Sequence, residues 1–143
     1  MAIRTVGVIG AGQMGSGIVQ VAASAGYDVL MQDISDEALR RAVSGIEKSL
    51  GKLVEKGKLA ADLAEGAKAR VKTVRTMEDL ASAALVIEAV TENPAIKFEI
   101  FKRLDAACKK EAILASNTSP ISITEIAAKT KRPGQVIGMH FMY

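Results

Sequence analysis

The residue of this chain best suited to proton transfer is His140, the single histidine among 143 residues. An imidazole with an ordinary pKa of about 6.5 exchanges protons with alcohols near neutral pH. Upstream lies the polar run Ser116-Asn117-Thr118-Ser119, in which Ser119 is free to hydrogen-bond a substrate oxygen. Acyl transfer by a serine–histidine pair is the competing use, but the sequence contains no nucleophile elbow. We therefore predict that His140 is a general base and that Ser119 binds the reacting oxygen.

The second chemical signature is a G-x-G-x-x-G motif, Gly10-Ala11-Gly12-Gln13-Met14-Gly15, between an apolar run and a helical pattern. Gly10 permits a tight turn, Gly12 lets the backbone approach a diphosphate, and Gly15 lets the helix pack closely on the strand. The free N–H groups and the positive dipole end of that helix then face the phosphates. The motif in this context predicts a dinucleotide site rather than an ordinary glycine-rich turn.

An acidic residue, Asp33, follows the last motif glycine by 18 residues, at the end of the apolar run Tyr27–Gln32. Its carboxylate can accept hydrogen bonds from both hydroxyl groups of an adenosine ribose, and it would repel a 2′-phosphate. No arginine directly follows Asp33 to offset that repulsion. These features favour NAD over NADP, and the preference would stay open if Asp33 were only a turn residue.

The elements that must position these residues alternate between strands and helices. We expect strands at Thr5–Ile9, Tyr27–Gln32, Thr73–Arg75, Ala84–Val90, Ala112–Ala115 and Gln135–Phe141. Such alternation predicts right-handed βαβ units, and hence an α/β, Rossmann-type, doubly wound and mainly parallel sheet. Ligands bind such sheets beyond the carboxyl ends of the strands, where Gly10–Gly15, Asp33, Thr91–Asn93, Ser116–Ser119 and His140 all fall. That placement favours a catalytic His140 over a histidine that is merely packed.

The expected helices have recognisable ends and apolar faces. Met14, Ile18, Val21, Ala22 and Ala25 mark the first helix, which Gly26 ends. Ser35 caps a long helix that runs to Lys56-Gly57, and a second one follows at Ala60–Val71 with Leu63 on its apolar face. These two helices predict a helical hairpin inserted between the second and third expected strands, Tyr27–Gln32 and Thr73–Arg75. Asn93-Pro94 begins another helix with Ile96, Ile100 and Leu104 inward, and Ser122 with Glu125 and Ile121 with Ile126 begin the last.

Composition excludes several classes of protein. The formal charge is +3, and no basic run interleaves with aromatic residues, so we expect no nucleic-acid partner. One cysteine and one histidine make a Cys/His metal site implausible, and Cys108 lies on an apolar helix face where core packing is expected. No apolar stretch approaches the ~20 residues of a membrane span. We expect a single, soluble, cytoplasmic domain.

Taken together, these motifs resemble the N-terminal domain of the 3-hydroxyacyl-CoA dehydrogenase family, close to its bacterial 3-hydroxybutyryl-CoA members. The resemblance covers essentially all 143 residues. It rests on V-I-G-A-G-Q-M-G-S-G (Val8–Gly17), Asp33, E-A-V-T-E-N (Glu88–Asn93), A-S-N-T-S (Ala115–Ser119) and G-M-H-F (Gly138–Phe141). It implies reversible, NAD-linked oxidation of (S)-3-hydroxyacyl-CoA to 3-oxoacyl-CoA.

The resemblance also implies roles for single residues. His140 is the base, and Ser119 binds the 3-oxygen of the substrate near the nicotinamide. Glu92 and Lys97 match positions that contact the cofactor, whereas Lys97 would otherwise be read as a solvated helix residue. Ser49 and Lys56 match positions that touch coenzyme A, and seven residues apart they can share one face of a helix. Without the resemblance, a charged helix face is the better interpretation of both.

Two departures from the family pattern qualify these expectations. Tyr143 stands where the family usually has asparagine, which puts that cofactor contact in doubt. The glutamate that orients the histidine and the helical domain that builds the dimer lie further along in the family. We therefore expect residues 1–143 to be the NAD-binding domain of a homodimeric parent, of low or no activity on their own.

Two further readings remain open. Another β-hydroxyacid dehydrogenase would share the glycine motif but use a lysine from a helical domain, and the S-N-T-S and G-M-H-F segments argue against it. A non-catalytic NAD-binding or structural protein is the third reading, because lens lambda-crystallin resembles the same family.

Overall fold

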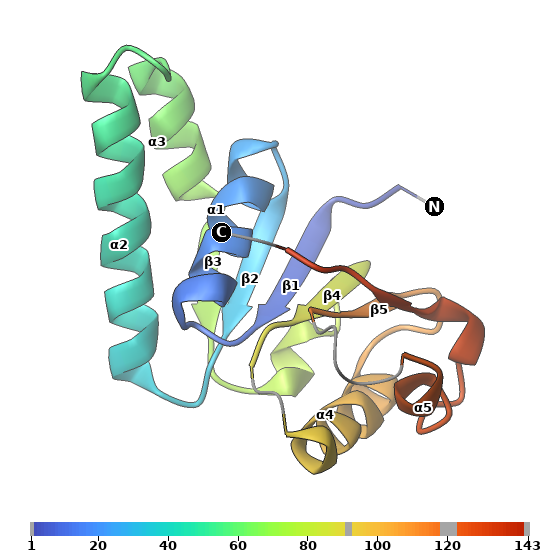
Figure 1. The fold of residues 1–143 in the computed structure, drawn as a ribbon. Helices are drawn as coiled ribbons and strands as arrows, with labels where there is room; N and C mark the ends of the chain where they lie inside the picture. Colours follow the sequence, from blue (N-terminus) through green and yellow to red (C-terminus); the bar gives the residue numbers. More distant parts are fainter. Residues whose placement is uncertain (1, 91–92, 118–122, 142–143) are drawn as a thin grey trace.

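The computed structural model describes residues 2–90, 93–117 and 123–141, which build a sheet covered by helices on both faces (Figure 1). Six strands are described, in the order β3-β2-β1-β4-β5-β6, and every neighbouring pair is parallel. They are β1 (Thr5–Ile9), β2 (Asp28–Gln32), β3 (Val71–Val74), β4 (Leu85–Glu88), β5 (Ile113–Ser116) and β6 (Val136–Gly138). This order is that of doubly wound dinucleotide-binding sheets, so the predicted fold class is confirmed.

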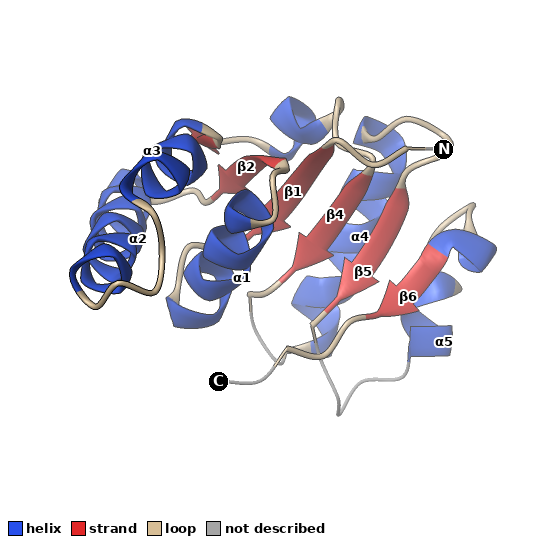
Figure 2. Ribbon diagram, turned by 90° about the horizontal axis from the view of Figure 1, so that it is seen from above, coloured by secondary structure: helices blue, strands red, loops and turns tan. Residues whose placement is uncertain are grey.

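The helices fall on two sides of this sheet, each with its own core (Figure 2). One core packs β1 and β2, with Ile87 of β4 and Ala115 of β5, against the first three helices; the other packs β4, β5 and β6, with Ile9 of β1, against the last two. The helices are α1 (Gln13–Ser24), α2 (Asp36–Glu55), α3 (Ala61–Ala69), α4 (Pro94–Ala107) and α5 (Ile123–Ala127), with short 3-10 turns η1 (Met77–Leu80) and η2 (Pro133–Gln135). Among the described helices, none is long and apolar enough to cross a membrane.

Between β2 and β3 the chain forms α2 and α3, which run side by side in opposite directions and project from one end of the sheet (Figure 1). Ser35 caps α2, with its hydroxyl oxygen accepting from the Ala38 N–H at 3.1 Å. Lys56 and Gly57 end the helix, and Gly57 has a φ of +69°, a conformation that favours glycine. Both ends lie where the sequence places them.

The predicted apolar faces are wrong at Ala25, which is exposed just beyond the end of α1, and at three larger side chains. Val21, Leu63 and Ile96 are exposed by 62%, 58% and 47%, although their spacing placed them inward. In α4 the neighbouring Lys97 takes the inward position instead, and it is 1% exposed. A helical period fixes a stripe only to within about one residue, so the tertiary partner decides which of two adjacent side chains is buried.

Apart from β1, the strands also differ from their predicted bounds by one to three residues, most at β3, β4 and β6. Val71, expected at the end of a helix, opens β3 and pairs with Val29 of β2. The last strand is shorter than expected, because Gln135 belongs to a 3-10 turn and β6 ends at Gly138. The expected cap by Ser122 and contact of Ile121 lie outside the described residues.

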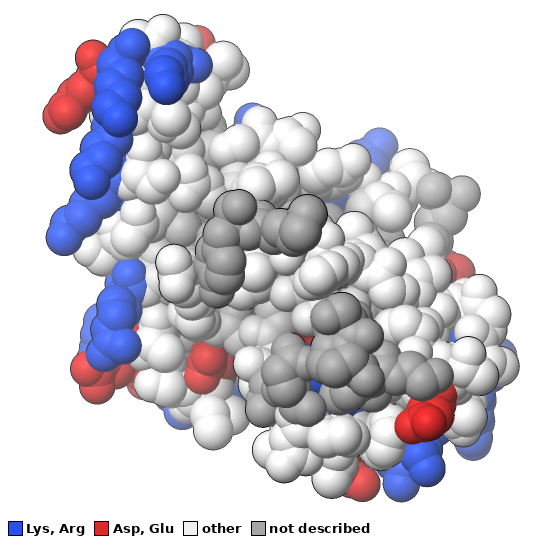
Figure 3. Space-filling view, viewed as in Figure 1, with Lys and Arg blue, Asp and Glu red and all other residues white. Residues whose placement is uncertain are grey.

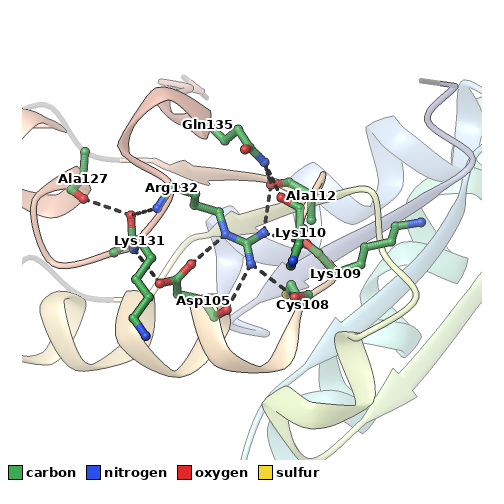
Figure 4. A network of polar contacts seen from close by, with 10 residues as sticks. Asp105, Cys108, Lys109, Lys110, Ala112, Ala127, Lys131, Arg132 and Gln135 are labelled. Carbon is green, nitrogen blue, oxygen red and sulfur yellow. Dashed lines mark hydrogen bonds and ion pairs between the residues drawn. The ribbon is translucent and has the colours of Figure 1, made fainter.

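Arg132 joins the carboxyl end of α4 to the turn that precedes β6 (Figure 4). Its Nε donates to Asp105 Oδ1 at 2.7 Å, and its other four contacts are backbone carbonyl oxygens. Those carbonyls belong to Asp105, Cys108, Lys109 and Ala112. All five donors of the guanidinium are thereby used, and they tie Asp105 of α4 to the segment 108–112 that leads into β5.

Cys108 lies beneath this network, and its thiol is buried, as the sequence predicted. Burial raises the pKa of the Cys108 thiol above its ordinary value; the Arg132 guanidinium opposes this effect and the Asp105 carboxylate adds to it. A thiol held in this protonated state is a packing group rather than a nucleophile.

Candidate functional site

Five strands end in register at one edge of the sheet. Ile9 pairs with both Gln32 and Glu88, Glu88 pairs with Ser116, and Ser116 pairs with Gly138. The residues that follow these ends therefore share one edge, as the sequence predicted. They include Gly10, Asp33, Ala89, Asn117 and Met139.

The glycine motif forms a turn that only glycine can make at two positions. Gly10 has a φ of +106°, and a Cβ there would lie 2.6 Å from the Ala89 carbonyl oxygen. A Cβ on Gly15 would lie 1.8 Å from the Gly10 carbonyl oxygen, so the helix can approach the strand only through glycine. Gly12 differs, since a Cβ there would meet nothing within 4 Å. The turn therefore packs closely against the rest of the chain at Gly10 and Gly15 and leaves open space at Gly12.

The open side of this turn is also the amino end of α1. Gly12 is the N-cap residue, and no side chain caps the helix. Gln13 is exposed, whereas Met14 is half-buried and packs against the core. Uncapped N–H groups and a positive helix dipole are what an anionic group such as a diphosphate binds. This part of the chain fits the diphosphate of NAD.

Asp33 connects the glycine turn to the start of α2. Its Oδ2 accepts from the Ala11 N–H at 3.0 Å, and its Oδ1 accepts from the Ser35 N–H at 2.9 Å. The carboxylate is half-buried and keeps further lone pairs for other donors. It therefore lies at the neighbouring strand end, where an adenosine ribose would need an acceptor.

Beside Asp33, a largely apolar hollow of about 140 Å³ opens at the same edge. Two of its side chains, Ile34 and Val90, are exposed by 79% and 50%. Exposed apolar surface around a polar acceptor suits a flat heterocycle such as adenine. The hollow is lined by Ile9, Gly10, Gln32, Asp33, Ile34, Met77, Val90 and Ile100.

His140 lies at the opposite end of this edge, two residues beyond β6. The side chain is exposed, and within the described residues its ring makes no hydrogen bond or ion pair. The two residues beside it are held, since the Met139 N–H donates to the Ser116 carbonyl at 3.0 Å and the Phe141 N–H donates to Asn117 Oδ1 at 2.8 Å. The imidazole is accessible on a fixed backbone. Ser119 and Glu92 lie outside the described residues.

The position of Lys97 on a helix suggested a solvated side chain, but the structure buries it. Its Nζ lies 2.6 Å and 2.7 Å from the two carboxylate oxygens of Glu88, and both side chains are at most 1% exposed. The Ser116 hydroxyl and the Val90 N–H donate to the same carboxylate, each at 2.8 Å. The sequence places Glu88 within the expected strand Ala84–Val90 but did not reveal the pair. A lysine nine residues later, on the inner face of the next helix, is the signal that would have found it.

The hairpin residues Ser49 and Lys56 lie on α2, away from the sheet edge. The Ser49 hydroxyl accepts from Gln20 Nε2 of α1 at 2.9 Å, whereas Lys56 is exposed at the end of the helix. Lysine and arginine side chains gather along the outer side of this hairpin (Figure 3). Ser49 therefore faces α1, whereas Lys56 is exposed at the end of the helix whose outer side carries basic side chains, a surface that suits a phosphorylated ligand.

No metal site accompanies this arrangement in the described ranges, which contain no group of three or more histidine, cysteine, aspartate or glutamate residues arranged to hold an ion.

Comparison with known proteins agrees with this geometry. Residues 5–143 match the family model described as 3-hydroxyacyl-CoA dehydrogenase, NAD binding domain. The chain belongs to the 3-hydroxyacyl-CoA dehydrogenase family. It is 54% identical, over 95% of its length, to a probable 3-hydroxybutyryl-CoA dehydrogenase from Deinococcus radiodurans and covers 49% of that protein. It is 48% identical to 3-hydroxyadipyl-CoA dehydrogenase from Escherichia coli, over 97% of the chain and 29% of the relative.

Solved structures of this family show the same fold. The crystal structure of (S)-3-hydroxybutyryl-CoA dehydrogenase from Ralstonia eutropha superposes with a TM-score of 0.95 at 46% identity. The match covers 99% of this chain and 50% of that one. The chain thus spans about half the length of these Deinococcus radiodurans and Ralstonia eutropha proteins, and it matches the model of the NAD-binding domain.

Proposed function

We propose that this chain is the NAD-binding half of an enzyme that oxidises (S)-3-hydroxyacyl-CoA, of the 3-hydroxybutyryl type, to 3-oxoacyl-CoA. The observation that carries the proposal is one sheet edge that holds a glycine turn, an acidic residue at the next strand end and an accessible histidine. Family membership supports this substrate class, because the relatives named above are called 3-hydroxybutyryl-CoA and 3-hydroxyadipyl-CoA dehydrogenases.

The cofactor side of the edge is the glycine turn with its flanking residues. Bound NAD would supply the hydride acceptor. The backbone of Gly10, Ala11, Gly12, Gln13, Met14 and Gly15 would hold its diphosphate, and Asp33 would accept from the ribose hydroxyls. Glu92 and Lys97 complete this side; since the Lys97 ammonium is paired with Glu88, its contribution is to hold the loop after β4.

On the substrate side, His140 takes the proton of the 3-hydroxyl group in oxidation and returns it in reduction. Ser119 donates a hydrogen bond to the same oxygen and keeps it near the base. Ser49 and Lys56 of the hairpin contact the coenzyme A portion, which the basic surface of α2 favours. We also expect the full-length protein to be a homodimer of the cytoplasm, without a nucleic-acid partner.

The test is a His140→Gln variant of the full-length protein, assayed for reduction of acetoacetyl-CoA with NADH. Removal of a general base should lower turnover by about 10²–10⁴-fold. NADH affinity should be unchanged, because the glycine turn and Asp33 are untouched.

Full activity in His140→Gln would place the base at another residue. If the unaltered full-length protein bound NADH without reducing any 3-oxoacyl-CoA, the proposal would fail in favour of a non-catalytic member of the family.

A further inference from the structure

A continuous set of hydrogen bonds joins the ends of β4, β5 and β6. It starts at Glu88, whose buried carboxylate accepts from Lys97, from the Ser116 hydroxyl and from the Val90 N–H. The Glu88 carbonyl oxygen also accepts from the Asn117 N–H at 2.9 Å. Glu88 therefore fixes both the side chain of the last β5 residue and the backbone of the residue after it.

Asn117 in turn binds the segment that carries His140. The Met139 N–H still donates to a β5 carbonyl, that of Ser116, at 3.0 Å. In a parallel ladder alternate residues donate to the same neighbouring strand, so Phe141 is the next donor. Its N–H is met by the Asn117 side chain, whose Oδ1 accepts at 2.8 Å. The Asn117 side chain therefore supplies an acceptor for this donor, one residue beyond the end of β5.

The consequence concerns the imidazole directly. Within the described residues the His140 ring has no hydrogen-bond partner, so its placement depends on the backbone to either side. One side is held by the sheet through Met139, and the other is held by Asn117 through Phe141. A displacement of about 1 Å in a reacting group can lower turnover by about 10²-fold.

We propose that Asn117 is a positioning residue for His140, anchored by the buried Glu88–Lys97 pair. It touches neither substrate nor cofactor in this proposal; it fixes the backbone beyond His140 through the Phe141 N–H. The inference rests on the proposed function, in which His140 is the base.

The test compares Asn117→Leu, which removes the acceptor at similar size, with Asn117→Asp, which keeps an acceptor oxygen. In the full-length protein, Asn117→Leu should lower kcat for acetoacetyl-CoA reduction by about 10- to 100-fold. NADH affinity and KM should stay close to their original values, and Asn117→Asp should recover most of kcat. Asn117→Ala gives the same comparison if the leucine variant does not fold.

The chain offers a matched control at the other end of β6. Gln135 Nε2 donates to the Lys110 and Ala112 carbonyls at 2.7 Å and 3.0 Å, so it also ties this strand to the rest of the fold through a side chain. Gln135→Leu should lower thermal stability and leave kcat unchanged. An equal loss of kcat in Gln135→Leu and Asn117→Leu would show a general structural effect and overturn the proposal.

His140→Gln in the same assay separates the two proposals. If His140→Gln is inactive and Asn117→Leu retains full kcat, the positioning role fails and the proposed function stands. If both variants retain full activity, the proposed function fails as well.

Discussion

Asp33 serves the fold and the proposed cofactor site with the same carboxylate. It accepts from the Ala11 N–H in the glycine turn and from the Ser35 N–H at the start of α2, so it sets the distance between two loops that would flank the adenosine. A charged acceptor forms stronger hydrogen bonds than a neutral one, by about 1 kcal/mol or more. The negative charge is therefore the property to test.

We predict that Asp33→Asn weakens NADH binding by about tenfold, since that ratio corresponds to about 1.4 kcal/mol. NADPH binding should change less or improve, because repulsion of the 2′-phosphate is removed. Fluorescence titration of both nucleotides measures the ratio of their dissociation constants. A ratio equal to that of the unaltered chain would take the discriminating role away from Asp33.

At the scale of elements, helix caps were readable from the sequence because they depend on neighbours in the chain, whereas most strand boundaries were missed by one to three residues. Ser35 and Asn93 cap α2 and α4 through hydrogen bonds to N–H groups two or three residues on. The carboxyl ends of the strands share one edge because neighbouring strands run parallel, as the alternation of strands and helices predicted. The inward rotation of Lys97 was not readable, since its cause, Glu88, lies on another element. Arg132 was missed for the same reason.

The Glu88–Lys97 pair results from the inward position of Lys97. We predict that removing the lysine alone destabilises the fold far more than neutralising both partners. Lys97→Met leaves a buried carboxylate unpaired and should lower the free energy of unfolding by about 3–5 kcal/mol. Adding Glu88→Gln should recover much of the loss, because a neutral amide oxygen still accepts from Ser116 and Val90. Urea denaturation of the single and double variants measures both values.

The same helix provides the control for this pair. Arg103 of α4 pairs with Glu78, and their side chains are 54% and 62% exposed. Arg103→Met should change stability by at most about 1 kcal/mol, because water screens an exposed pair. If Lys97→Met were no more destabilising than Arg103→Met, the buried pair would not hold these elements together.

The hairpin of α2 and α3 carries a separate prediction, because it projects from the sheet away from the glycine turn (Figure 1). Lys56→Ala in the full-length protein should raise KM for acetoacetyl-CoA about two- to fivefold, the loss expected for one exposed charge contact of up to about 1 kcal/mol. The NADH dissociation constant should not change. Lys102→Ala is the control, because Lys102 is an exposed lysine of α4 that pairs with Glu99. An unchanged KM in Lys56→Ala would return the hairpin to a purely structural role.

At the scale of the whole molecule, the two halves of the sheet carry different parts of the proposed site. The first half, β1 to β3 with α1, carries the diphosphate turn and Asp33, whereas the second half, β4 to β6, carries His140. The seam lies between β1 and β4, where Gly10 packs against the Ala89 carbonyl and Glu88 begins the bonds that lead to Asn117. The proposed cofactor site is built by the glycine turn and Asp33, which contact each other within this chain.

This division predicts that residues 1–143 bind NADH in a saturable manner while reducing acetoacetyl-CoA at least about 100-fold more slowly than the full-length protein. Binding needs only the glycine turn and Asp33, but turnover needs a substrate held against an oriented base, and this chain covers 49% of its Deinococcus radiodurans relative. Fluorescence titration and a stopped assay on both proteins give the two numbers. Gly15→Ala is the specificity control, because its Cβ would lie 1.8 Å from the Gly10 carbonyl oxygen and should abolish NADH binding. Full turnover by the 143-residue chain would show that the second half is dispensable for catalysis; NADH binding that survives Gly15→Ala would place the nucleotide away from the glycine turn.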